Sequence, residues 1–244
     1  MSTENLWIRR FHPSERARVR LVCLPHAGGS ASFWFPVSHA LSPEVDVVCV
    51  QYPGRQDRRD EPGLDSITAL ADGVTAALGP WQDLPLAFLG HSMGALVGFE
   101  VASRLQERGV LAETLFVSAR RAPSRYRSEH VHLRTDEEVV AELRALSGTE
   151  SDLLGDDEIV RMILPAVRSD YRAVETYRYT PRPPLKARVV ALAGESDPRV
   201  DVAEVAAWEE HTAGAFELRT FPGGHFFLAP HREAVLTVLR ENLL

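Results

Sequence analysis

The sequence predicts an α/β fold in which helices cover both faces of a mostly parallel sheet. Two observations carry this prediction. The chain has 244 residues, of which 45% are apolar and 25% charged, as in a globular protein with a large core. Short runs rich in β-branched residues alternate with segments of helical periodicity, and this alternation is typical of a parallel sheet. We expect a single domain over residues 1–244.

Each predicted strand is a short apolar run, and most read as buried. The runs are Val19–Leu24, Val45–Val50, Leu86–Leu89, Thr114–Val117, Val189–Ala193 and Phe216–Phe221. Trp7–Phe11 is a candidate edge strand. The segments with helical spacing are Phe33–Leu41, Ile67–Leu78, Ala95–Arg108, Val200–His211 and Pro230–Leu244.

One long interval, residues 119–187, interrupts this alternation. A crossover between parallel strands needs only about 10–12 residues, so the interval holds additional structure. We expect a helical insertion over approximately residues 120–186. It forms either a lid over the carboxyl edge of the sheet, where open α/β folds keep their sites, or two ordinary packing helices.

Two helices are predicted inside the insertion. Thr135–Glu138 has the pattern of a capping box and opens a helix to about Leu146, with Gly148 just beyond its end. A second helical stretch runs from about residue 156 to 177, and Pro165 should kink or split it.

A candidate nucleophile lies between a predicted strand and a predicted helix. The segment Gly90-His-Ser92-Met-Gly94 matches Gly-x-Ser-x-Gly in the strand–turn–helix context that this motif requires. The sharp turn strains the backbone at Ser92 and leaves no room for side chains two residues away on either side. The amide of Met93 then lies at a helix N-terminus, where it can face a developing oxyanion. The alternative is a tight turn with an idle serine.

His225 is the candidate general base for Ser92. It follows a predicted strand and the loop Pro222–Gly224, which can direct an imidazole across the sheet edge. The other histidines after Ser92 are His130, His132, His211 and His231. His211 ends a predicted helix and His231 lies in the first turn of another, which are positions typical of surface or capping residues.

Asp197 is the candidate acid that orients this histidine. It follows the predicted strand Val189–Ala193 through a short loop, which places it at the same sheet edge as Ser92. Glu195 and Asp201 are the alternatives. Glu195 comes very soon after the strand, and Asp201 falls at a helix start.

The loop after the first buried strand is rich in small residues. It reads Pro25-His-Ala-Gly-Gly-Ser30, and Ala27 is the best-placed donor of a second oxyanion amide. A phosphate-binding loop is not favoured, because Gly-x-x-x-x-Gly-Lys-Ser/Thr is absent. His26 and His91 flank this region and are interpreted as packing residues. The sequence shows no clustered metal-ligand spacing, and we expect no metal.

Five motifs together resemble the type II thioesterases that accompany polyketide and nonribosomal peptide synthases. They are residues 25–30, Tyr52-Pro-Gly-Arg-Gln56, Gly90–Gly94, Gly194-x-x-Asp197 and Gly223-Gly-His-Phe226. The resemblance extends from about residue 19 to about 230. It implies an α/β-hydrolase fold with a helical lid and a free-standing enzyme that needs no cofactor.

The resemblance also implies a reaction and a partner. The reaction is hydrolysis of acyl thioesters on the phosphopantetheine arm of acyl or peptidyl carrier proteins, which would remove stalled or aberrant acyl groups. Two alternatives stay open: an esterase that uses the same residues on small oxygen esters, and a non-catalytic binding protein of the same fold.

A cluster of arginines opens the insertion. Its members are Arg120, Arg121, Arg125, Arg127 and Arg134, with Glu129 between them. Because carrier proteins are generally acidic and their arm begins with a phosphodiester, Arg121, Arg125 and Arg127 are candidates for carrier binding. An ordinary solvated charge run is the alternative.

The remaining composition excludes several classes of protein. The net charge of −7 argues against nucleic-acid binding. Cys23 and Cys49 lie inside apolar runs and are expected to be buried thiols. The N-terminus lacks a basic start followed by an apolar stretch, and no run approaches the ~18 residues that a membrane span needs. We expect a cytoplasmic monomer.

Overall fold

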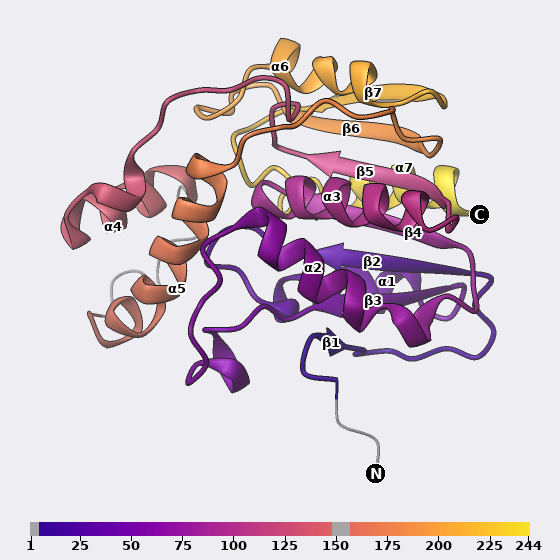
Figure 1. Ribbon diagram of the computed structural model, residues 1–244, viewed down its shortest axis with the longest axis horizontal. Coiled ribbons are helices and arrows are strands. Elements are labelled where there is room, and N and C mark those ends of the chain that lie inside the picture. Colours follow the sequence, from indigo (N-terminus) through magenta and orange to yellow (C-terminus); the bar gives the residue numbers. More distant parts are fainter. Residues whose placement is uncertain (1–4, 148–156) are drawn as a thin grey trace.

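The computed structural model describes residues 5–147 and 157–244, which form a sheet flanked by helices (Figure 1). Seven strands pair in the order β1-β3-β2-β4-β5-β6-β7. Strands β2 to β7 are parallel, and β1 pairs antiparallel with β3 at one edge. The strands are β1 (Ile8–Arg9), β2 (Val19–Leu24), β3 (Val45–Val50), β4 (Leu86–His91), β5 (Ala112–Ser118), β6 (Arg188–Gly194) and β7 (Phe216–Phe221).

Helices cover both faces of this sheet, which confirms the predicted architecture. The α-helices of the described residues are α1 (Phe35–Leu41), α2 (Ile67–Ala77), α3 (Met93–Glu107), α4 (Asp136–Ser147), α5 (Asp157–Thr176), α6 (Val202–Ala206) and α7 (Arg232–Leu243). Short 3-10 helices are η1 (Ala31–Trp34), η2 (Gln56–Arg58), η3 (Gly79–Trp81), η4 (Val131–Leu133) and η6 (Ala207–His211). Figure 1 shows α2 and α3 in front of the sheet and α1 and α7 behind it.

Two hydrophobic layers lie on opposite faces of the sheet because side chains alternate along a strand. Along β2, Val22 and Leu24 join the layer formed with α2 and α3. Leu21 and Cys23 join the layer formed with α1 and α7. All six residues of β2 are buried, as expected for a strand that is covered on both faces.

The predicted boundaries match most closely in the strands. Val19–Leu24, Val45–Val50 and Phe216–Phe221 have the predicted ends. The helix predicted over residues 200–211 is divided, because α6 ends at Ala206 and the chain continues as η6. Pro165 lies inside α5 without splitting it.

The insertion places α4 and α5 beyond the end of the sheet at which the parallel strands stop (Figure 1). These helices share a small core with η4, formed by Val131, Val139, Val140, Leu164 and Val167. Gly148 and residue 156, where one helix was predicted to stop and the next to begin, lie outside the described residues.

Each end of the insertion is attached to the main body. At its start, the amide of Ala122 donates to the carbonyl oxygen of Glu204 at 3.0 Å. At its end, the Tyr177 hydroxyl donates to Glu100 on α3 at 2.6 Å, and Arg182 forms an ion pair with the same carboxylate at 2.9 Å. Glu100 is buried, so this junction is well shielded from solvent.

Candidate active site

Ser92 occupies the strained turn between β4 and α3. Its φ is 53° and its ψ is −114°, a conformation that L-residues rarely adopt. A Cβ atom at Gly90 would overlap the carbonyl of Gly94, and a Cβ atom at Gly94 would overlap the carbonyl of Leu24. The amide of Ser92 donates to the carbonyl oxygen of Ser118 at 2.8 Å. The two glycines therefore allow the close approach that this turn requires.

Asp197 and His225 lie together at the same edge of the sheet. Nδ1 of His225 and Oδ2 of Asp197 are 2.8 Å apart, and both side chains are buried. The other oxygen of Asp197 accepts the amide of Arg199 at 2.8 Å. A carboxylate at Nδ1 favours the tautomer that carries its proton there, which leaves Nε2 free to accept one.

The two alternative acids and the alternative base His211 have other surroundings. Asp201 caps α6, where its amide donates to Glu204 at 3.0 Å, and Glu195 is exposed. His211 was expected to be a surface or capping residue, but it is only 4% exposed. It lies 2.9 Å from the hydroxyl of Ser124 and packs against aromatic rings, so it belongs to the core.

Three amides in the loop after β2 differ in what they bind. The amide of Gly28 donates to Asp170 at 2.7 Å, and the amide of Gly29 donates to the carbonyl of His26 at 2.9 Å. Among the described residues, the amide of Ala27 has no hydrogen-bond acceptor. Ala27 lines the same cavity as Ser92. Its amide is therefore available to a ligand there.

Two histidines lie at this loop: His26, which is part of it and half-buried, and His91, which is fully buried at the end of β4. Burial, and then the nearby His225 and Arg55, lower the pKa of His26 to about 3. Burial also holds the pKa of His91 well below its ordinary value. Nδ1 of His91 lies 3.0 Å from the hydroxyl of Ser118. Both imidazoles are therefore neutral packing groups at neutral pH, in agreement with the sequence-based interpretation.

A cavity of about 520 Å³ connects these groups. Ser92, Ala27 and His225 all line it. Its apolar wall comes mainly from the insertion and includes Leu143, Leu146, Met162, Ile163, Ala166 and Val167. An apolar wall of this kind suits a hydrocarbon group that is held next to the serine.

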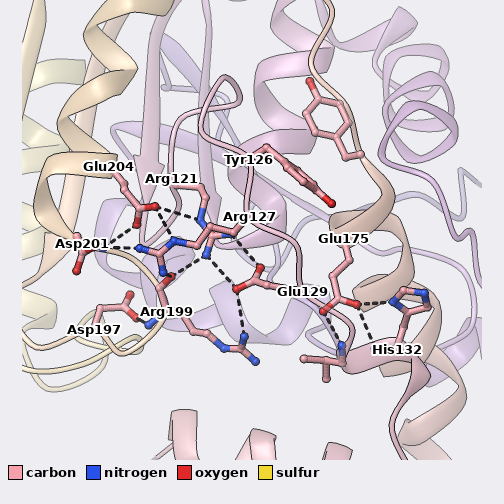
Figure 2. Close-up of polar contacts among 12 residues, drawn as sticks. Arg121, Tyr126, Arg127, Glu129, His132, Glu175, Asp197, Arg199, Asp201 and Glu204 are labelled. Carbon is pink, nitrogen blue, oxygen red and sulfur yellow. Dashed lines mark hydrogen bonds and ion pairs between the residues drawn. The ribbon is translucent and has the colours of Figure 1, made fainter.

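The predicted arginine cluster is largely neutralised by Glu129 within it and by acids from other parts of the chain. Arg121 binds both oxygens of Glu129, at 2.9 and 3.1 Å, and its side chain is only 4% exposed (Figure 2). Arg127 pairs with Asp201 and Glu204, at 3.0 and 2.9 Å. The positive patch expected from local sequence is thus compensated in the folded protein.

The other three arginines of the cluster differ in their partners. Arg125 pairs with Glu210, and Arg134 pairs with Glu142 at 3.0 Å. Arg120 lines the cavity and has no ion pair among the described residues. Its Nε is buried without a hydrogen-bond partner, and burial lowers its pKa to about 10.

Sequence reasoning missed one buried ion pair at the site. Arg55 binds both oxygens of Asp170, at 2.6 and 2.9 Å, and joins the loop after β3 to α5. The available signal was Asp170 itself, because a charged residue within the apolar stripe of a predicted helix indicates a buried partner. Its partner is 115 positions away in the chain, a separation that local patterns do not reveal.

Two other features are absent from residues 5–147 and 157–244. No group of three or more His, Cys, Asp or Glu side chains there has a geometry suited to a metal ion. No helix in the same ranges has the length and apolarity needed to span a membrane.

The parallel sheet, the strained serine turn and the aspartate–histidine pair at the carboxyl edge define an α/β-hydrolase. Residues 19–243 match the thioesterase domain family. The chain belongs to this family.

Similar proteins include two thioesterases of Streptomyces species and a type II thioesterase of known structure. Thioesterase PikA5 of Streptomyces venezuelae is 52% identical over 241 residues, which cover 98% of this chain and 86% of that protein. A probable cadicidin biosynthesis thioesterase of Streptomyces griseus is 51% identical over 97% of this chain, which spans 66% of that protein's length. The structure of BorB, a type II thioesterase from the borrelidin biosynthetic cluster, superposes with a TM-score of 0.94 at 51% identity and full coverage of both chains.

Proposed function

We propose that this protein hydrolyses acyl thioesters on the phosphopantetheine arm of acyl or peptidyl carrier proteins, and so clears stalled acyl groups from a polyketide or nonribosomal peptide synthase. The observation that carries the proposal is the buried Asp197–His225 hydrogen bond beside Ser92, in a cavity with an apolar wall. The similarity to PikA5 and BorB supports this substrate class.

The reaction begins with attack by the Ser92 hydroxyl on the thioester carbonyl. His225 accepts the hydroxyl proton at Nε2, while Asp197 stabilises the imidazolium through Nδ1. The amides of Met93 and Ala27 donate to the oxygen of the tetrahedral intermediate. Met93 is the first residue of α3, so its amide has no acceptor within the helix.

The intermediate collapses when the carbon–sulfur bond breaks. The imidazolium returns its proton to the departing sulfur, which leaves as the pantetheine thiol, and the acyl group stays on Ser92. Water then attacks the acyl-serine and gives its proton to His225. The acid is released when Ser92 regains that proton. This route uses side chains and backbone amides of the chain together with water, and it needs no cofactor. We propose that the reaction takes place in the cytoplasm.

Ser92→Ala tests the proposal. We expect kcat for an acyl-carrier thioester to fall by at least about 10³-fold while carrier binding persists, because the covalent route is lost. Ser103→Ala is the matched control, since Ser103 is a buried serine of α3. It should keep wild-type turnover. Substantial activity of Ser92→Ala would refute the nucleophile.

Two comparisons test the remaining roles. His225→Ala should cost about as much as Ser92→Ala, because residues that act as a unit have non-additive effects. Asp197→Asn should cost more than Asp201→Asn, because Asp197 binds His225 whereas Asp201 caps α6. Faster cleavage of a matched oxygen ester than of the carrier thioester would identify an esterase instead.

A further inference from the structure

A fully buried carboxylate on the insertion reaches the loop that carries Ala27. The side chain of Asp170, on α5, is 0% exposed. Its Oδ2 accepts the amide of Gly28 at 2.7 Å and the Arg55 guanidinium at 2.6 Å. Arg55 also donates to Oδ1 at 2.9 Å and to the carbonyl oxygen of Gly29 at 3.2 Å. Helix α5 and the loop after β3 therefore meet at the loop after β2.

Packing reinforces these hydrogen bonds. Val167 lies about one turn before Asp170 on α5 and faces Gly28 so closely that a Cβ atom at Gly28 would lie 2.7 Å from its Cγ2. Gly28 has a φ of +75°, which favours glycine. The loop is thus fixed both by its own backbone conformation and by two residues of the insertion.

Asp170 and Arg55 together form a clamp on this loop. The clamp restricts which amides the loop can present to the cavity. Of the three consecutive amides of residues 27–29, Asp170 occupies that of Gly28 and the carbonyl of His26 occupies that of Gly29, so that of Ala27 remains free to donate into the cavity. Loss of the Asp170 acceptor would free the Gly28 amide and remove the restraint on the peptide that precedes it.

The charge of the clamp also bears on the reaction. A lone carboxylate near the developing oxyanion would oppose its formation, and low polarity around the site would strengthen the repulsion. Arg55 binds both oxygens of Asp170 and is itself buried, so the pair has no net charge. The Asp170 carboxylate therefore holds the loop without adding a net negative charge next to the developing oxyanion.

We propose that Asp170 and Arg55 are positioning residues that hold the loop so that the Ala27 amide faces the reacting carbonyl oxygen. Helix α5 is then part of the catalytic framework as well as a wall of the acyl pocket. This inference rests on the proposed function, because it assumes that Ala27 stabilises an oxyanion formed by attack of Ser92.

The first test compares two substitutions at Asp170. Asp170→Ala removes the acceptor, and a misplaced donor should lower kcat about 100-fold with KM changed less than about threefold. Asp170→Asn keeps an oxygen for the Gly28 amide, so it should retain more activity, with a loss of about 10-fold. Equal losses in the two variants, or losses confined to KM, would overturn the inference.

Asp46→Ala and Asp46→Asn are the matched controls. Asp46 is also a fully buried aspartate, held by Arg10 at 2.7 Å and Arg20 at 2.8 Å, but it lies at the start of β3 near the opposite end of the sheet. These controls should lower the unfolding temperature and keep kcat at a permissive temperature. A comparable fall of kcat in the controls would reduce the role of Asp170 to general stability.

The second test separates the transition state from the ground state. A boronic acid that forms a tetrahedral adduct with Ser92 should bind Asp170→Ala about 100-fold more weakly, in step with kcat. A carrier-bound amide that cannot be cleaved should bind as it does to the wild type. Parallel weakening of both ligands would contradict a role in positioning the oxyanion donor.

The third test removes the charges separately and together. Arg55→Met leaves an unpaired carboxylate beside the loop, so it should lose more activity than Asp170→Asn. The double variant Arg55→Met/Asp170→Asn should recover part of that activity, and its neutral core should fold even where a single variant does not. No recovery in a folded double variant would refute the charge argument.

Inactive Ser92→Ala together with fully active Asp170→Ala would reject this inference alone, whereas active Ser92→Ala would reject the proposed function.

Discussion

His26 should make the folded protein sensitive to acid. Its imidazole is neutral in the folded state because burial lowers its pKa to about 3. In the unfolded chain a histidine has a pKa of about 6.5. Between about pH 3 and 6.5 the unfolded state therefore binds one more proton at this position. The free energy of unfolding should fall as the pH is lowered through this window, and the contribution is fully present only above about pH 6.5.

The size of the effect follows from these two pKa values. Each unit of pH below 6.5 costs about 1.4 kcal/mol while His26 stays neutral in the folded state. At pH 5.0 the loss is about 2 kcal/mol relative to pH 7.5. His91, whose pKa burial also lowers, should add a loss of the same sign.

His26→Gln removes the titrating group and isolates its share. Urea unfolding followed by tryptophan fluorescence at pH 5.0, 6.0 and 7.5 gives the free energy of unfolding at each pH. The difference between pH 7.5 and 5.0 should be about 2 kcal/mol smaller in the variant than in the wild type. His39→Gln, which changes an exposed histidine of α1, should keep the wild-type difference.

The test depends only on how the free energy of unfolding changes with pH. The absolute stability of His26→Gln does not matter, because the lost contacts with Phe33 and Phe226 affect all pH values alike. If the variant and the wild type lose the same free energy between pH 7.5 and 5.0, His26 is protonated in the folded state and the burial argument fails.

Two further predictions concern the substrate. Ala166 is buried and lines the cavity from α5, so Ala166→Leu should displace about three methylene groups of a long acyl chain. At about 0.8 kcal/mol per methylene, kcat/KM for the longest acyl-carrier substrates should fall roughly 60-fold. The kcat/KM for an acetyl-carrier substrate should barely change. Equal losses for all chain lengths would show that the apolar wall does not hold the acyl group. The side chains of Arg125 and Arg127 are 42% and 41% exposed, and we propose that they steer the acidic carrier despite their ion pairs. Arg125→Gln/Arg127→Gln should raise KM for carrier-bound substrate severalfold and weaken its salt dependence, with little effect on an N-acetylcysteamine thioester, and equal effects on both substrates would reject this role.

Local patterns predicted the sheet because its strands have a distinctive composition. The runs at residues 19–24 and 45–50 are dense in valine and leucine and are buried on both faces. Most helix ends were less well predicted. Helix α3 begins at Met93, two residues before the predicted start, because the strained backbone of Ser92 allows the helix to begin at once.

The polar part of the site depends on contacts that sequence patterns do not encode. The arginine run at residues 120–134 has a positive local charge, yet Asp201, Glu204 and Glu210 neutralise much of it from another part of the chain. The ion pair between Arg55 and Asp170 likewise joins distant segments. Counting the charges that are close in sequence therefore does not predict the net charge that surrounds such a region in the folded protein.

The attachment of the insertion at both ends makes it an exchangeable module. The insertion leaves the main body near Ala122 and returns near Tyr177, whose hydroxyl donates to Glu100. A chimaera with recombination points just inside these two contacts would keep the recipient's sheet and acquire the donor's acyl pocket. The donor segment must also bring an acid equivalent to Asp170, because Arg55 remains in the recipient. Chain-length preference should then be transferable between family members as one cassette.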